Sequence, residues 1–166
     1  MSQIITLGGG GSGESVIGKA MLQLEANESG ATDGSRTDIE LDNWGVVSTV
    51  TGVTTESNYL VLSGVGTFII TTRLYSRDNT TSGSNTDIGI DVLDGSDNLL
   101  ESSRYYVGKP SSTYTRIAHE FTMMFVHDSS SDVTQLKFQT ISAVGQIVLV
   151  GDADAQFSTI EVLKIA

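Results

Sequence analysis

The fold is decided by residues 59–75, which read YLVLSGVGTFIITTRLY. Two apolar runs of strand length flank a turn that contains Gly66. In an extended chain, successive side chains point to opposite faces, so a set of alternate apolar residues marks a strand with one buried face. The second run carries such a set, formed by Phe68, Ile70 and Leu74. The stretch therefore predicts two β-strands joined by a short turn, with these three side chains in a core.

The same pattern continues along the chain in both directions. Alternate apolar sets that we expect in the core recur at Ile88, Ile90 and Val92 and at Ile117, Phe121, Met123 and Phe125. Runs rich in Asp, Asn, Ser and Gly separate the apolar segments and are typical of turns. Ten segments have strand length: 20–25, 37–41, 59–62, 67–75, 87–93, 104–107, 117–127, 134–141, 146–150 and 157–165. This number is typical of a sandwich, so we expect an all-β fold of two antiparallel sheets in a jelly roll of about ten strands.

Composition restricts the partners of the protein. The chain has 166 residues, enough for one domain, and its 9 basic against 20 acidic residues give a net charge of -11. Such a charge repels nucleic acid and anionic membranes, and we expect neither as a partner. The chain has no cysteine, so the fold must be stable without disulfides. The first residues lack the basic start of an export signal, and we expect synthesis in the cytoplasm without classical export.

The N-terminal residues form a distinct segment. Ile4, Ile5 and Leu7 lie in a short β-prone run, and residues 8–13 read GGGGSG, the composition of a flexible linker. We therefore divide the chain into a flexible Gly-rich attachment arm at residues 1–17 and a jelly-roll domain at residues 18–166. A tag of this kind can add a strand to an exposed sheet edge of another protein. We expect Ile4, Ile5 and Leu7 to make that attachment.

The glycine run also matches two nucleotide-binding patterns by spacing. Gly8, Gly10 and Gly13 fit the dinucleotide fingerprint, but that motif functions inside a parallel βαβ unit, and no helices alternate with strands downstream. The phosphate-binding loop requires a lysine where this chain has Glu14, whose carboxylate would repel phosphate. We therefore expect no cofactor.

The remaining polar residues do not predict an enzyme. His119 and His127 fall in one strand, about 26 Å apart if it is straight, so they cannot share a metal ion. We expect them to be ordinary surface or interface histidines, and we assign no catalytic residue and no metal ligand. Calcium remains an open alternative for the loop aspartates, although Asx turns on a solvated surface are favoured: Asp94, Asp97, Asp128, Asp132, Asp152 and Asp154.

From Gly18 to the C-terminus, the order of segments resembles the jelly roll of tumour necrosis factor and of complement globular heads, especially their phage-borne virion relatives. Residues 20–24 and 37–44 resemble the paired opening strands, residues 59–70 the strand, turn and aromatic of the family, and residues 157–166 its closing strand. Residues 14–25 could also form a helix, since Val16, Ile17, Ala20, Met21 and Leu24 have helix-like spacing, but the resemblance favours a strand there. The resemblance implies a two-sheet sandwich that assembles as a compact homotrimer.

A second set of observations also favours an oligomer. Residues 147–150 are apolar at successive positions, which exceeds the need of a half-solvated strand. Residues near the C-terminus show the same feature and are our candidates for the trimer interface: Ile160, Val162 and Leu163, with Ile165 beside them. We expect a second protomer to cover this extra apolar surface.

Three functions fit such a domain, namely a virion structural protein, a binding module and an enzyme for which no site is found. Receptor-binding heads usually follow a long shaft, whereas here a short tethered tag precedes the domain. We therefore expect a trimeric capsid decoration (cement) protein of a tailed phage, attached to the major capsid protein or another virion platform and located in the virion. The alternative is a receptor- or glycan-binding head of a short fibre or adhesin.

Overall fold

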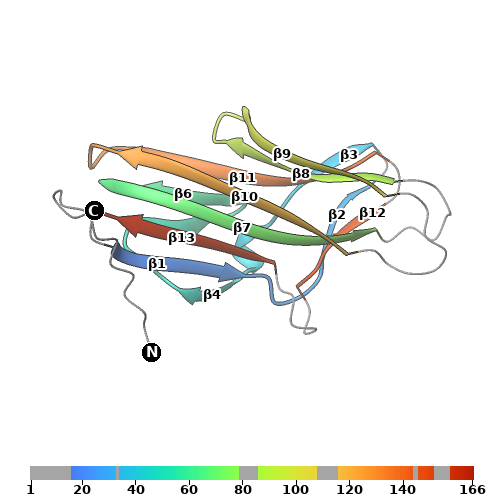
Figure 1. Cartoon of the computed structure of the whole chain (residues 1–166), viewed down its shortest axis with the longest axis horizontal. Coiled ribbons are helices and arrows are strands. Elements are labelled where there is room, and N and C mark those ends of the chain that lie inside the picture. The colour runs from blue at the N-terminus through green and yellow to red at the C-terminus, as the bar shows by residue number, and fades with distance from the viewer. Residues whose placement is uncertain (1–15, 33, 79–85, 108–115, 144–145, 152–157) are drawn as a thin grey trace, which may run out of the picture.

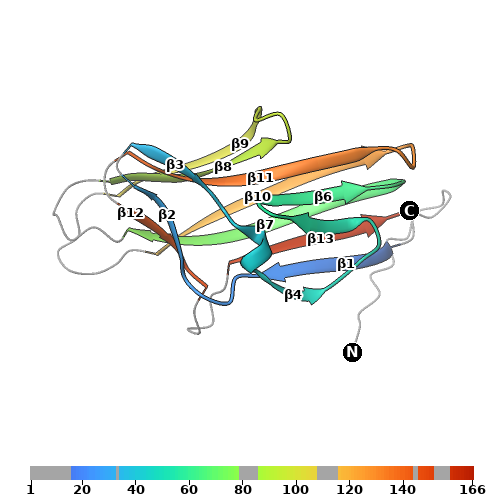
Figure 2. The same cartoon turned by 180° about the vertical axis from the view of Figure 1, so that it is seen from behind.

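We describe a computed structural model of the chain, which covers residues 16–32, 34–78, 86–107, 116–143, 146–151 and 158–166 (Figure 1). These residues form thirteen strands and one short 3-10 turn, η1 (Leu41–Asn43). All strand pairs are antiparallel, and the strands form two stacked sheets (Figures 1 and 2). In the described part of the chain no helix is long and apolar enough to cross a membrane.

Sheet A is built around β7 (Gly66–Asp78), the longest strand. On one side β7 pairs with β10 (Arg116–His127), and on the other it pairs first with β13 and then with β12. The order from end to end is β2-β12-β7-β13-β1-β4. Its remaining strands are β1 (Val16–Gln23), β2 (Glu28–Thr32), β4 (Gly45–Ser48), β12 (Gln146–Leu149) and β13 (Thr159–Ile165).

Sheet B faces the inner side of sheet A and has the order β5-β6-β11-β8-β9, with β3 also paired to β11. Its strands are β3 (Ser35–Asp38), β5 (Val53–Glu56), β6 (Tyr59–Ser63), β8 (Thr86–Asp94), β9 (Leu99–Val107) and β11 (Val133–Ser142). The two sheets therefore enclose one main core, as the sequence pattern predicted.

The residues that decided the fold prediction form β6 and β7. Phe68, Ile70 and Leu74 are fully buried between the sheets. Most of the alternate sets of β8 and β10 face the same core, whereas Ile88 and Ile117 belong to a second, smaller cluster. Gly66 opens β7 with a φ of 141°, and a Cβ atom there would lie 2.9 Å from Cε of Lys164 and 3.0 Å from the Ile165 carbonyl oxygen. Glycine is thus required at this position because of both its conformation and its close contact with β13.

Each predicted segment overlaps a strand, and Val16–Gln23 is a strand and not a helix. Three strands were not predicted, namely β2, β4 and β5. These strands are four or five residues long and rich in Ser, Thr, Gly and Glu, so they lack a clear apolar alternation. β4 and β5 are also the terminal strands of their sheets. The sheet also begins at Val16, two residues before the predicted domain boundary.

Candidate interaction surface and buried histidine

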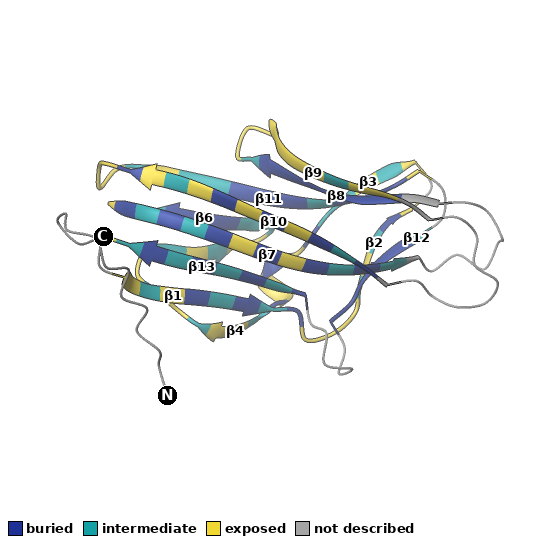
Figure 3. Cartoon of the chain, in the orientation of Figure 1, coloured by how far each residue is buried: buried dark blue, intermediate teal, exposed yellow. Residues whose placement is uncertain are grey.

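The outer face of sheet A carries an apolar patch. Alternate residues of its strands point away from the core, and cross-strand pairing brings several apolar side chains together, since Leu163 pairs with Ile69 and Ile69 with Met124. Met124 is 65% exposed, and Val126 and Ile17 are also exposed. We call this set the sheet A patch: Ile17, Ile69, Met124, Val126, Leu163 and Ile165. Figure 3 shows the alternation of buried and exposed positions along β7 and β10 that produces it.

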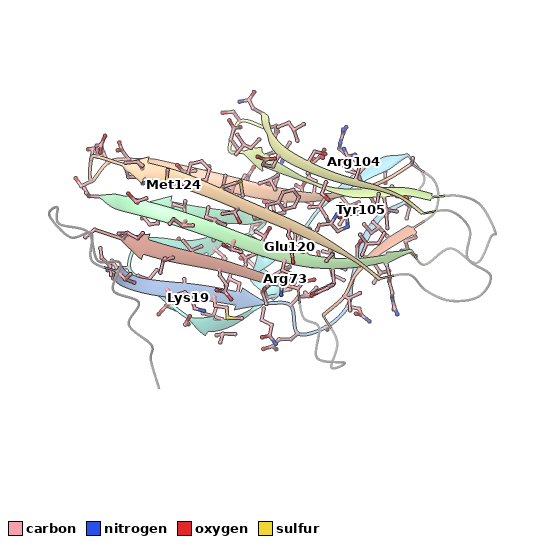
Figure 4. The ribbon with its side chains drawn as sticks, viewed as in Figure 1. Lys19, Arg73, Arg104, Tyr105, Glu120 and Met124 are labelled. Carbon is pink, nitrogen blue, oxygen red and sulfur yellow. The ribbon has the colours of Figure 1, made fainter. Side chains whose placement is uncertain are left out.

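Two ion pairs lie beside the sheet A patch on the same face. Lys19 Nζ is 3.1 Å from a Glu161 carboxylate oxygen, and Arg73 Nε is 2.6 Å from Glu120 Oε1. Figure 4 shows Arg73 and Glu120 side by side on β7 and β10. All four side chains are substantially exposed in the protomer. Charged pairs around an apolar centre are typical of the rim of a protein interface.

The outer face of sheet B is different because polar groups cover it. Asp91 has a side chain only 4% exposed, and it accepts contacts from Arg104 at 2.9 Å and from Ser102 at 2.7 Å. Lys137 binds Asp97, and Gln139 donates to Asp38 at 2.6 Å. Among the apolar residues of this face, Val61 and Leu93 are buried, Ile141 is half-buried and Val133, at the start of β11, is 60% exposed. The charged groups named above are therefore partnered within the protomer.

The predicted trimer-interface residues of β13 lie on opposite faces of the strand. Ile160 and Val162 are each 1% exposed and belong to the core between the two sheets. They cannot contact a second protomer, so for these two residues the interface prediction is wrong. Leu163 points to the outer face, is half-buried and belongs to the sheet A patch. Its role in a trimer stays a prediction.

The apolar run at residues 147–150 has a similar outcome. Ile147, Val148, Leu149 and Val150 are all buried in the isolated protomer. β12 lies between β2 and β7, and residues of the same chain cover both of its faces. The expectation that a second protomer covers this run is therefore wrong. Among the described residues, the sheet A patch is an apolar surface that remains exposed.

The attachment residues Ile4, Ile5 and Leu7 lie outside the described residues, as do the glycine motifs at residues 8–13 and the aspartates Asp152 and Asp154. The attachment role of the arm therefore remains a prediction.

His119 is fully buried at the junction between the two sheets, so the prediction of a surface or interface histidine is wrong. Its side chain points inward from β10, the edge strand of sheet A, and reaches β9, the edge strand of sheet B. Nε2 is 2.8 Å from Ser76 Oγ, and Nδ1 is 3.0 Å from Ser103 Oγ. The ring of Tyr105 meets the imidazole edge to face at 5.3 Å.

This environment keeps His119 neutral. Burial, with a smaller contribution from the nearby Arg104 guanidinium, lowers the pKa of His119 to about 4. A neutral imidazole donates from one nitrogen and accepts at the other, and each serine hydroxyl can take the complementary role. A serine beside a histidine can act as a nucleophile, but Ser76 is fully buried and no substrate can approach its Oγ atom. The group therefore connects the edges of the two sheets.

His127 is also buried, near the other end of β10, and the surface prediction is wrong for it too. Its Nδ1 lies 3.1 Å from the Gly64 carbonyl oxygen, and its Nε2 lies 2.9 Å from Thr134 Oγ1. Both histidines occupy inward-facing positions of β10, which the apolar pattern alone would assign to hydrophobic residues. Their spacing in the same phase as Ile117, Phe121 and Met123 is the signal that could have identified them as inward-facing.

Two loop aspartates within the described residues, Asp94 and Asp132, have partners in their own turns, whereas Asp97 binds Lys137 of β11. Asp94 accepts hydrogen bonds from the backbone of Ser96 and Asn98, and the bonds from Asn98 lower its pKa. Asp132 accepts from the backbone N–H groups of Asp128 and Ser129. In the described ranges, no group of three or more His, Asp or Glu side chains is placed to hold a metal ion. The carboxylates of Asp94 and Asp132 form the Asx turns favoured by the sequence.

Comparison with known proteins identifies the fold. No protein-family model and no curated protein sequence matches the chain. Among solved structures, the tumour necrosis factor Eiger from S. frugiperda is 10% identical with a TM-score of 0.60, over 92% of this chain and 94% of that one. Murine APRIL is 13% identical with a TM-score of 0.47, over 89% and 99%. The PRD1 vertex protein P5 is 19% identical with a TM-score of 0.45, over 92% and 99%.

At such low identity a structural likeness shows the fold alone. The likeness to Eiger covers nearly the whole of both chains and agrees with the two antiparallel sheets described above. The chain therefore has the jelly-roll fold of the tumour necrosis factor-like proteins, and the resemblance first drawn from its order of strands is confirmed.

Proposed function

We propose that this protein is a structural component of a phage virion, a homotrimer that decorates the capsid of a tailed phage. The observation that carries the proposal is the sheet A patch, which exposes Met124 and Val126 on a sheet whose inner face is already packed. A contiguous exposed apolar patch marks an interaction site on a folded domain. Within the described residues, the outer face of sheet B carries paired charges such as Asp91–Arg104 and Lys137–Asp97 in place of such a cluster.

A closed symmetric assembly would cover this surface, which is exposed in the protomer. In a closed ring each protomer gives and receives the same contacts, which leaves no apolar face open. Packing of Leu163, Ile69 and Met124 around a threefold axis would remove their exposed area from water, with the Lys19–Glu161 and Arg73–Glu120 pairs toward the rim. The jelly-roll fold is compatible with this arrangement.

The attachment arm supplies the second part of the proposal. Ile4, Ile5 and Leu7, tethered by residues 8–13, would bind the major capsid protein or another virion platform by adding a strand to its sheet. Three arms on one trimer would raise the avidity of attachment beyond that of a single arm. The proposed role is structural, and the buried Ser76–His119 pair takes no part in catalysis.

The test is the attachment of purified protein to capsids assembled without it. Deletion of residues 1–13 should leave the oligomer intact and abolish binding to the capsids, measured by cosedimentation, while the full chain binds saturably. Truncated protein that still binds would refute attachment through the arm. A full chain that binds no capsid but binds host-cell glycans would favour the receptor-binding head.

A further inference from the structure

An apolar cavity of about 300 Å³ opens between the two sheets on the side formed by β4 and β5. Its floor consists of core residues, which include Leu22, Leu60, Ile160 and Val162, and its mouth includes the exposed residues Val46 and Thr54. A cavity of about 150 Å³ accommodates a benzene ring. The space is therefore sufficient for about two branched aliphatic side chains.

The cavity marks a difference between the two sides of the sandwich. On the opposite side, where β10 faces β9, His119 connects the sheets through its contacts to Ser76 and Ser103. On the cavity side, β4 and β5 are both terminal strands of their sheets. Within the described residues β5 pairs only with β6, so its outer edge is free to accept backbone hydrogen bonds.

A segment of this chain has the chemistry and the reach to fill the cavity. Ile4, Ile5 and Leu7 are branched aliphatic residues in an uncharged, β-prone run. Residues 8–15 join this run to Val16, the first residue of β1, and eight extended residues span up to roughly 26 Å. Ala20 lines the cavity four residues along β1, about 13 Å from Val16. The glycines of the tether allow the reversal of direction that this path requires.

We propose that in the free protein the segment Ile4–Leu7 of the same chain docks in this cavity and places aliphatic side chains over Ile160 and Val162. The inference does not depend on the proposed function, but the two are linked. The residues that would attach to a capsid are the ones that fill the cavity, so attachment would require their release.

Disulfide trapping tests the proposal, because the natural chain has no cysteine. Ile5→Cys is combined with Val46→Cys, which lines the cavity, or with Val47→Cys as the matched control. Val46 and Val47 are each 59% exposed, but as neighbours on β4 they point to opposite faces. Under mild oxidation the Val46 pair should form an intrachain disulfide several-fold faster than the Val47 pair, measured by non-reducing electrophoresis and peptide mass spectrometry.

A second measurement uses no cysteine. The triple variant Ile4→Ser, Ile5→Ser and Leu7→Ser should increase amide hydrogen exchange in β5, relative to a control with Ser2→Ala and Gln3→Ala. Equal trapping rates for the two cysteine pairs, disulfide-linked dimers in place of intrachain bonds, or unchanged exchange in β5 would each overturn the proposal. These experiments use the isolated protein, so their failure would leave the capsid-binding result of the proposed function unaffected.

Discussion

The two outer faces of the sandwich arise from the same alternation of inward and outward residues, but their outward side chains differ. Those of sheet B include charges that are paired within the protomer, and those of sheet A include exposed apolar groups. On sheet B, outward-facing charges pair within the protomer, as Asp91 does with Arg104 and Lys137 with Asp97. On sheet A, the outward-facing positions of β7, β10 and β13 carry Ile69, Met124 and Leu163, of which Met124 is 65% exposed and the other two are half-buried. This difference is the basis of the proposal that sheet A faces a partner.

The largest effect should separate the two faces of β13. Ile160→Asp would bury a carboxylate in the core and should destabilise the protomer by more than about 4 kcal/mol, enough to unfold most small domains. Leu163→Asp lies on the outer face and should weaken the oligomer while the protomer remains folded. Circular dichroism and sedimentation would distinguish these outcomes. Similar unfolding in both variants would mean that both faces of β13 are needed for the protomer itself.

The next effect concerns the junction between the sheets at His119. Its pKa is about 4 in the folded protein and 6.5 in the unfolded chain, so the unfolded chain binds the proton more readily. The free energy of unfolding contributed by the neutral histidine is therefore fully present above pH 6.5. It is lost as the pH falls toward 4, by an amount on the order of 3 kcal/mol.

Urea unfolding between pH 7 and 4.5 measures this contribution. His119→Gln should be less stable than the natural chain at pH 7, because it loses the fit between Ser76 and Ser103, and its stability should fall less steeply with decreasing pH. Carboxylates titrate in both proteins, so the difference between the two slopes isolates His119. Parallel slopes would show that this side chain is not held neutral by burial.

The smallest effect compares one arginine from each face. Arg104→Ala removes a partner of the buried Asp91 on sheet B and should destabilise the protomer by about 1–3 kcal/mol, although Ser102 and Arg36 still contact that carboxylate. Arg73→Ala on sheet A breaks an exposed pair and should leave protomer stability nearly unchanged. Chemical denaturation under monomeric conditions measures both variants. A larger loss of stability in Arg73→Ala than in Arg104→Ala would contradict the contrast between the two faces.

The sequence predicted the fold well because its strands alternate clearly where they face the core. Phe68, Ile70 and Ile90 were assigned to the core from that pattern, and all three are fully buried. The short edge strands were missed because such positions do not require apolar residues. β4 gains its conformation from pairing with β1, which is distant in sequence, and β5 gains it from a hairpin with β6. The composition of these short segments reports neither pairing.

The candidate interface was harder to predict because β13 has apolar residues on both of its faces. Val162 and Leu163 are adjacent and similar, and only the pairing of Val162 with Ile70 and of Leu163 with Ile69 shows which one faces the core. The polar residues on inward positions were misjudged for a related reason. Lys164 is buried because its Nζ donates to the Thr51 carbonyl oxygen and lies 4.9 Å from the ring centroid of Phe68, contacts that depend on tertiary structure.

The central claim is that the outer face of sheet A joins three protomers, and sedimentation equilibrium at micromolar concentration tests it most directly. The natural chain should give about three times the 17.6 kDa mass of the monomer. Met124→Asp, in the sheet A patch, should reduce this to the monomer mass, whereas Val133→Asp, 60% exposed at the start of β11, should leave the trimer intact. A natural chain of monomer mass, or a trimer that Met124→Asp does not weaken, would contradict the account.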